Sequence, residues 1–218
     1  MSFVVTVDGP AGAGKSTVTR RVARHLGIRY LDTGALYRAV AYCLDKKGVA
    51  PNEGEELTGA LSAISVRLES EGIFVNGEDV TALIRSPRVD RVVSAYAALR
   101  TVRGALLDLQ RKQSDHGALI VDGRDTGTVV FPEADLKFFL TASPEARAER
   151  RYRELLKKGE AVVYREVLAQ MYERDRADSA REVAPLKEPV GAIRIDTSSM
   201  TETEVVNELS FIVQRGMS

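Results

Sequence analysis

The chain has 218 residues, of which 44% are hydrophobic and 28% are charged, as is typical of one folded domain of ordinary size. Its 31 basic and 31 acidic residues cancel to a formal net charge of +0, which disfavours nucleic acid and anionic membranes as partners. We expect no secretory leader and no membrane span, and the single cysteine, Cys43, fits a reducing, cytoplasmic setting.

The N-terminal residues predict a strand, a glycine-rich loop and a helix. Residues 3–7 form an apolar run within a predicted strand at 3–8, and residues 15–27 carry apolar side chains at helical spacing. The sequence between them has the pattern G-x-x-x-x-G-K-S, in which backbone N–H groups surround a polyphosphate. A chance match in a glycine-rich turn is the alternative, and the strand before and helix after argue against it. The residues expected to hold a nucleoside triphosphate are Gly9, Pro10, Ala11, Gly12, Ala13, Gly14, Lys15, Ser16 and Thr17.

Within this loop, two side chains have separate expected roles. Lys15 can reach the β- and γ-phosphates, and the Ser16 hydroxyl can ligate Mg²⁺. Elsewhere the sequence offers no metal-ligand cluster, since its two histidines, His25 and His116, are far apart.

The middle of the chain predicts helices interrupted by a small antiparallel insert. Residues 66–69 alternate in polarity, and residues 72–77 end in an Asn-Gly turn, which favours a β insert at about 65–80. The remaining predicted elements of this part are a strand at 28–31 and helices at 34–47, 53–64, 87–97 and 100–114.

The C-terminal half predicts further strands that alternate with helices. Strands are expected at 117–122, 136–140 and 192–196, with helices beginning near Ser143, covering 163–180 and covering 201–215. With the first two strands, these make an α/β fold built on a doubly wound five-stranded parallel sheet. Ligands of such sheets bind at the carboxyl ends of the strands, where Asp8, Asp32 and Asp122 fall.

Arginines spread along the chain suggest that a second anion binds beside the triphosphate. Arg38, Arg103 and Arg124 fall in or near elements that follow strands, and no guanine-reading Asn-Lys-x-Asp segment is present. These features favour a small phosphate-loop kinase. A kinase for another monophosphate or a small metabolite, and a non-catalytic nucleotide switch, remain the alternatives.

Two further charged clusters have two readings each. Arg174, Asp178 and Arg181 are spaced to share one helix face, which is compatible with a solvated salt-bridged stripe or with an anion pocket. The cluster of Arg147, Arg150 and Arg151 is likewise compatible with either a surface or a functional role.

Three motifs closely resemble those of bacterial cytidylate kinases. They are Asp32-Thr33-Gly34-Ala35-Leu36-Tyr37-Arg38, the run from Asp122 to Pro132 that begins Asp122-Gly123-Arg124-Asp125, and Arg174-x-x-x-Asp178-x-x-Arg181 with Ala184-Pro185-Leu186 after it. The motifs stand in family order and extend over nearly the whole chain. Thr33 stands where many relatives carry serine, and both residues supply a hydroxyl.

The resemblance implies a role for individual residues. The catalytic residues would be Lys15, Arg124, Arg150, Arg151 and Arg174, with Arg150 and Arg151 in a lid over the ATP phosphates. The residues implied to bind CMP are Thr33, Tyr37, Arg38, Ser94, Arg103, Arg124, Asp125, Arg174, Asp178 and Arg181. A carboxylate such as Asp125 can accept from the cytosine amino group, while Arg103 and Ser94 can donate to its acceptors.

The resemblance also implies an activity and a domain organisation. The chain would transfer the γ-phosphoryl of ATP to CMP or dCMP, with Mg²⁺ bound to ATP, as a cytoplasmic monomer without nucleic-acid or membrane partners. Its single domain, of the P-loop nucleoside monophosphate kinase type, would have a core of residues 1–33, 117–150 and 182–218. A small α+β lobe at about 34–116 would bind the monophosphate, and a short helical lid would cover about 151–173.

Overall fold

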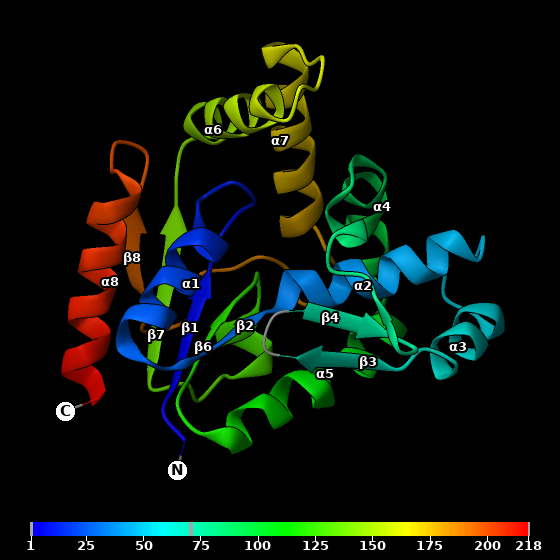
Figure 1. The fold of residues 1–218 in the computed structure, drawn as a ribbon, viewed down its shortest axis with the longest axis horizontal. Helices are drawn as coiled ribbons and strands as arrows, with labels where there is room; N and C mark the ends of the chain where they lie inside the picture. Colours follow the sequence, from blue (N-terminus) through cyan, green and yellow to red (C-terminus); the bar gives the residue numbers. More distant parts are fainter. Residues whose placement is uncertain (1, 70–71, 218) are drawn as a thin grey trace. The chain divides into compact units, whose positions relative to one another are not determined.

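The computed structural model describes residues 2–69 and 72–217, which form two compact units. The first unit comprises Met1–Leu31 and Gln113–Ser218, and the second comprises Asp32–Lys112. Each unit has its own sheet, so the two are described separately (Figure 1).

A five-stranded sheet forms the centre of the first unit, as the sequence predicts. Its strand order is β2-β6-β1-β7-β8, and β1 pairs in parallel with both β6 and β7, as β7 does with β8. Every residue of β1 is buried, because its side chains find apolar partners on both faces. The strands are β1 (Val4–Asp8), β2 (Arg29–Asp32), β6 (Leu119–Asp122), β7 (Leu136–Thr141) and β8 (Ile193–Asp196).

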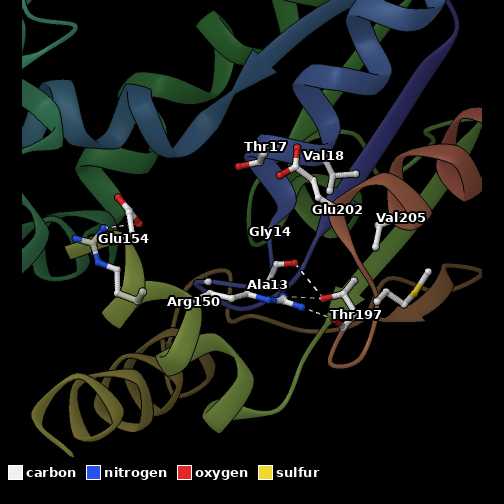
Figure 2. A pocket seen from close by; sticks show the side chains of 12 residues that line it. Ala13, Gly14, Thr17, Val18, Arg150, Glu154, Thr197, Glu202 and Val205 are labelled. Carbon is white, nitrogen blue, oxygen red and sulfur yellow. Dashed lines mark hydrogen bonds and ion pairs between the residues drawn. The ribbon is translucent and has the colours of Figure 1, made fainter. Parts of the chain in front are cut away.

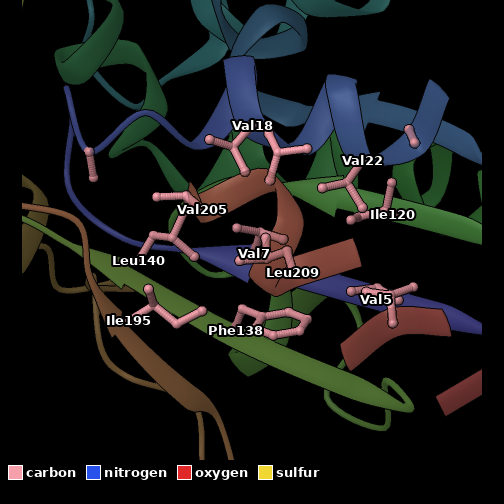
Figure 3. Close-up of a cluster of buried hydrophobic side chains, with 14 residues drawn as sticks. Val5, Val7, Val18, Val22, Ile120, Phe138, Leu140, Ile195, Val205 and Leu209 are labelled. Carbon is pink, nitrogen blue, oxygen red and sulfur yellow. The ribbon is translucent and has the colours of Figure 1, made fainter. Parts of the chain in front are cut away.

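Helices α1 (Lys15–Leu26) and α8 (Glu202–Met217) pack against each other and share one core cluster with the sheet. Figure 3 shows Val18 and Val22 of α1 and Leu209 of α8 meeting Val7 and Phe138 of the strands. Two local signals end α1 and begin α8. Gly27 closes α1 with a left-handed φ of 65°, and Thr201 and Glu204 form a capping box at the start of α8.

Helices α6 (Pro144–Lys157) and α7 (Tyr164–Ser179) lie side by side and pack on each other (Figure 1). The Ser143 side chain caps α6 by accepting from the Ala146 N–H at 3.1 Å. Ala148, Val167 and Met171 are the buried members of a separate apolar cluster between the two helices. The hairpin therefore has an internal core distinct from that of the sheet.

One prediction about this hairpin is wrong. Arg181 does not share a helix face with Arg174 and Asp178, because α7 ends at Ser179 and Arg181 follows it in irregular backbone. The cluster is also not a solvated stripe, since the side chains of Asp178 and Arg181 are only 2% and 6% exposed.

The second unit combines helices with the predicted antiparallel insert. Its sheet has the order β3-β4-β5, and both of its strand pairs are antiparallel. Ile73 and Val75 of this sheet pack with Ala39 of α2 in one buried cluster. The elements are α2 (Thr33–Lys46), α3 (Glu55–Ser62), β3 (Val66–Glu69), β4 (Gly72–Val75), β5 (Glu78–Asp79), a 3₁₀ turn (Leu83–Arg85), α4 (Pro87–Ala97) and α5 (Arg100–Arg111).

Two more short helical turns follow α5 and β6, and only the second is absent from the predicted elements, because the predicted helix at 100–114 overlaps the first. A 3₁₀ turn covers Lys112–His116, and a π-helical turn covers Thr126–Val130 directly after Asp125. Among the described helices, none combines the length and the apolarity that a membrane crossing requires.

Candidate active site

The glycine-rich loop joins β1 to α1, so it lies at the carboxyl end of a central strand. Gly12 and Gly14 have φ values of 78° and 85°, which glycine adopts without steric cost. A Cβ added at Gly9 would lie 1.9 Å from the Leu140 carbonyl oxygen of β7. Glycine at these positions lets the loop fold tightly against the sheet and leaves Gly14 at the N-terminus of α1.

Lys15 begins α1 and is only 5% exposed. Its Nζ donates to the carbonyl oxygen of Pro10 at 2.7 Å, within the loop itself. Burial, followed by the nearby Arg124 charge, holds the pKa of Lys15 well below its ordinary value, although the charges of Asp122, Asp8 and Asp178 oppose this shift. An anion at this position would favour the charged lysine, so the site is suited to a phosphate group.

Ser16 and Asp122 bring two oxygen donors together beside the loop. The Ser16 hydroxyl donates to Asp122 Oδ2 at 2.6 Å, and the Tyr30 hydroxyl donates to Asp122 Oδ1 at 2.7 Å. The strand register explains this meeting, because Asp122 at the end of β6 pairs with Val7, which precedes Asp8 in β1. A hydroxyl and a carboxylate are ligands that Mg²⁺ accepts.

Asp8 has a structural partner of its own. It accepts from the Thr126 N–H at 2.8 Å, the Thr126 hydroxyl at 2.7 Å and the Gly127 N–H at 2.7 Å. Burial raises the pKa of the Asp8 carboxyl, although these hydrogen bonds and Lys15 counter the shift. Asp8 thus fixes the π-helical turn that follows Asp125. Asp125 itself is only 4% exposed.

Arg124, Asp178 and Arg181 form a charged cluster in the first unit, in which Asp178 and Arg181 are buried and Arg124 is half-buried. Arg124 Nε donates to Asp178 Oδ2 at 2.8 Å, and Arg181 forms an ion pair with Oδ1 of the same carboxylate. Burial alone would raise the pKa of Asp178, but Arg124, Arg181 and Arg174 together lower it. Three guanidinium groups thus act on one carboxylate, so positive charge exceeds negative charge.

A cavity of about 520 Å³ lies between the loop, α6 and the start of α8 (Figure 2). Arg150 points across it to Thr197, donating to the hydroxyl at 3.1 Å and to the carbonyl oxygen. Thr197 in turn donates to the Ala13 carbonyl at 3.3 Å, which connects α6 to the loop. Arg151 also lines this cavity and pairs with Glu154 at 2.8 Å.

The second unit contains the remaining predicted residues. The Arg103 guanidinium lies 5.3 Å from the centre of the Tyr37 ring, a distance at which cation–π attraction operates. Arg38 pairs with Asp90 at 2.5 Å. Thr33 is buried at the start of α2, and Ser94 is half-buried on α4.

The structure therefore brings together two groups of predicted residues, one in each unit. The first unit unites the loop with Arg124, Arg174, Asp178 and Arg181, and places Arg150 and Arg151 at the cavity beside the loop. The second unit unites Tyr37 with Arg103.

Sequence reasoning singles out Asp122 and Arg147 without giving either of them a specific role, and it misses Thr197. Asp122 ends the buried strand β6, where the sequence predicts a ligand-binding edge, and Thr197 directly follows β8, so its place at a strand end is the signal that could have identified it. Arg147 belongs to a cluster for which the sequence allows a surface or a functional role, and the surface reading is wrong for this residue, since its side chain is only 3% exposed and hydrogen-bonds to the loop.

A parallel sheet with this loop after its first strand, and an arginine cluster nearby, defines the class of phosphate-loop phosphotransferases. The model of the family described as cytidylate kinase matches residues 5–215. A cytidylate kinase of Clostridium tetani is 44% identical over 214 residues, covering 98% of this chain and 95% of the relative. One of Thermotoga neapolitana is 45% identical over 218 residues, covering 100% and 99%.

The chain therefore belongs to the cytidylate kinase family and is a nucleoside monophosphate kinase. A crystal structure from Thermus thermophilus is similar to the fold, with a TM-score of 0.50, 16% identity and coverage of 100% of this chain and 98% of that one. At this identity the likeness concerns the fold alone.

Proposed function

We propose that this chain transfers the γ-phosphoryl group of ATP to CMP or dCMP, giving CDP or dCDP. The observation that carries this proposal is the cluster of Arg124, Asp178 and Arg181, whose guanidinium groups come from segments outside the triphosphate loop. A nucleotide switch would have no need for this second anion-binding group. The names of the relatives support CMP as the acceptor.

The acceptor base would be read by side chains suited to cytosine. Asp125 would accept from the amino group, and Ser94 and Arg103 would donate to the carbonyl and ring nitrogen. Uracil carries a carbonyl in place of that amino group, so a buried Asp125 would face it unpaired. Thr33 and Tyr37 would line the same pocket.

The acceptor phosphate and ribose would be held by charged residues. Arg38, Arg124, Arg174 and Arg181 would bind the phosphate, because a guanidinium presents several donors to anionic oxygens. Asp178 would accept from the ribose hydroxyl groups. The acceptor oxygen is already anionic, so no general base is needed and catalysis rests on positioning and charge neutralisation.

Mg²⁺ fits the donor site on its chemistry. The Ser16 hydroxyl and the Asp122 carboxylate lie 2.6 Å apart and are hard oxygen donors, which Mg²⁺ prefers. When bound with ATP, the ion would supply charge neutralisation at the β- and γ-phosphates. Lys15 would add to that neutralisation from the start of α1.

The α6–α7 hairpin would act as a lid over the donor. The segment at about 151–173 has its own apolar cluster, so it has the internal packing to move as one body. Arg150 and Arg151 at its base would contact the ATP phosphates. We further propose a cytoplasmic monomer, with a core of 1–33, 117–150 and 182–218 and a monophosphate-binding lobe at about 34–116.

A coupled assay with a panel of acceptors tests the activity. ATP would be supplied with CMP, dCMP, UMP, AMP or shikimate, and we expect CMP or dCMP to give the highest kcat/KM. Titration calorimetry with CMP alone adds a second test, since a switch would not bind it. Preferred phosphorylation of another acceptor would overturn the proposal.

Lys15→Ala tests the donor site within the same assay. Because Lys15 is buried and would contact transferring phosphoryl oxygens, its loss should lower kcat by at least about 1,000-fold. Lys157→Ala, which removes an exposed lysine of α6, is the matched control and should retain activity. Near-normal turnover by Lys15→Ala would refute the role of the loop.

A further inference from the structure

Arg147 of α6 makes hydrogen bonds to three separate segments of the first unit. Its Nε donates to the Ala142 carbonyl at 2.9 Å, and its Nη1 donates to the Ala11 carbonyl at 3.0 Å. The same guanidinium makes a two-point ion pair with Asp175 of α7, at 2.9 and 2.5 Å. One buried side chain thus connects the segment after β7, the phosphate loop and α7.

The contact with Ala11 determines how the loop presents its backbone. A trans peptide is planar, so the N–H of Gly12 points opposite to the Ala11 carbonyl and therefore away from Arg147. Phosphate binding by a glycine-rich loop depends on the direction of such N–H groups. The approach is also close, because a Cβ at Gly12 would lie 3.1 Å from the Arg147 Cβ.

The contact with Asp175 determines the position of the end of α7. Asp175 and Asp178 are three residues apart in this helix and therefore lie on one face. Asp178 pairs with Arg124, so two arginines from different elements hold the same face of α7. Arg174, a proposed catalytic residue, precedes Asp175 directly.

We propose that Arg147 is a positioning residue that keeps the phosphate loop and the final turns of α7 in one productive arrangement. We assign it no contact with either substrate, because its side chain is 3% exposed and its guanidinium donates to Ala142, Ala11 and Asp175. Through Ala11 it orients the donor-binding loop, and through Asp175 it orients the helix that carries Arg174 and Asp178. This inference rests on the proposed transfer from ATP to CMP.

The low exposure of the Arg147–Asp175 pair distinguishes it from ordinary surface ion pairs. The Arg147 side chain is 3% exposed and that of Asp175 is 26% exposed. Arg153 on the same helix provides the contrast, because its pair with Glu149 at 2.7 Å leaves the arginine 71% exposed. Exposed pairs of that kind contribute little to stability, so Arg153→Ala is the matched control.

The test uses four variants of the full chain: Arg147→Ala, Arg147→Lys, Asp175→Ala and the double alanine variant. Each is characterised by kcat with ATP and CMP, by the calorimetric Kd for ATP and by its Tm. We expect kcat to fall by about 100-fold in Arg147→Ala, the size of loss that a displacement of about 1 Å produces. The double variant should be no worse than Arg147→Ala, because both changes break one connection.

A merely structural role predicts different results. Asp175 lies on α7 and not in the ATP-binding loop. The inference nevertheless requires Asp175→Ala to weaken ATP binding, because Arg147 connects Asp175 to Ala11 of that loop. Arg147→Lys keeps the charge but lacks the donors for all these partners, so it should have low kcat even where Tm is near that of the wild type. It also provides a folded variant should Arg147→Ala fail to fold.

Three results would overturn the inference: a folded Arg147→Lys enzyme with kcat within threefold of wild type, an unchanged Kd for ATP in Asp175→Ala, or multiplicative losses in the double variant. Arg153→Ala should stay within twofold of wild type throughout. The Kd for ATP does not depend on the acceptor, so the inference can be judged even if the wild-type chain phosphorylates something other than CMP. Phosphorylation of an acceptor other than CMP would refute only the proposed function.

Discussion

Replacing Asp178 by asparagine tests whether this carboxylate holds the arginine cluster together. The side chain is 2% exposed, and its two oxygens bind Arg124 and Arg181. Asparagine has nearly the same shape, so Asp178→Asn removes the negative charge with little change in packing. It leaves two guanidinium groups close together without their counter-charge.

The structure sets the expected size of this effect. Opposite charges about 4 Å apart attract by about 4 kcal/mol at the effective dielectric constant of partly buried sites. Part of that attraction offsets the desolvation of the charges. Removing one partner of a buried pair costs about 3–5 kcal/mol, and for a chain of this length each kcal/mol lowers Tm by about 2–4 °C. We therefore expect Asp178→Asn to lower Tm by about 6–20 °C.

The pH dependence of the difference in stability between wild type and Asp178→Asn tests whether the lost carboxylate charge causes it. The folded pKa of Asp178 is lowered, so its stabilisation is fully present above the unfolded pKa of about 3.9 and is lost as pH falls through the folded value. The gap in unfolding free energy between wild type and Asp178→Asn should therefore be largest at neutral pH and shrink in acid.

The assay is thermal and urea unfolding, followed by circular dichroism over a range of pH. Glu173→Gln, an exposed carboxylate on the same helix, is the control and should change stability by less than about 0.5 kcal/mol. A gap below about 1 kcal/mol at neutral pH, or one that does not shrink in acid, would refute the reasoning.

Three further predictions concern the acceptor, the metal and the loop. Asp125→Ala should reduce kcat/KM for CMP by at least about 100-fold while the calorimetric Kd for ATP stays within about threefold, and equal losses for both would contradict its reading of the base. Asp122→Asn should raise the Mg²⁺ concentration needed for half-maximal activity by about tenfold or more, and an unchanged titration curve would exclude it from the metal site. Gly9→Ala should prevent stable folding, because the new Cβ would meet a strand carbonyl at 1.9 Å. Gly59→Ala, in open space within α3, should instead stabilise the chain by about 0.5–1 kcal/mol, and similar melting curves for the two variants would contradict the steric argument.

The elements of the core could be predicted because their signals are local. Strand β1 is rich in valine, and α8 begins with a capping box in Thr201 and Glu204. The loop from Gly9 to Thr17 combines glycines with Lys15 and Ser16 at fixed spacing, so its ligand class follows from residues that are neighbours in the chain.

The sequence by itself also placed Asp178 with Arg174 and Arg181, but it could not decide whether this cluster was a solvated stripe or a site. Only burial decided that question, since Asp178 is enclosed between Arg124 and Arg181, and Arg181 arrives from beyond the end of α7. Burial depends on which distant segments meet, and no local pattern reports it.

Asp122 and Arg147 are the clearest examples of residues whose contacts are determined by the tertiary structure. Asp122 meets Ser16 because the strand order places β6 beside β1, and that order is set by packing of whole elements. Arg147 reaches Ala11 and Asp175 from a helix that is distant in sequence from the loop. Local chemistry thus determined the elements and the triphosphate loop, whereas the long-range pairing of strands and helices decided which charges act together.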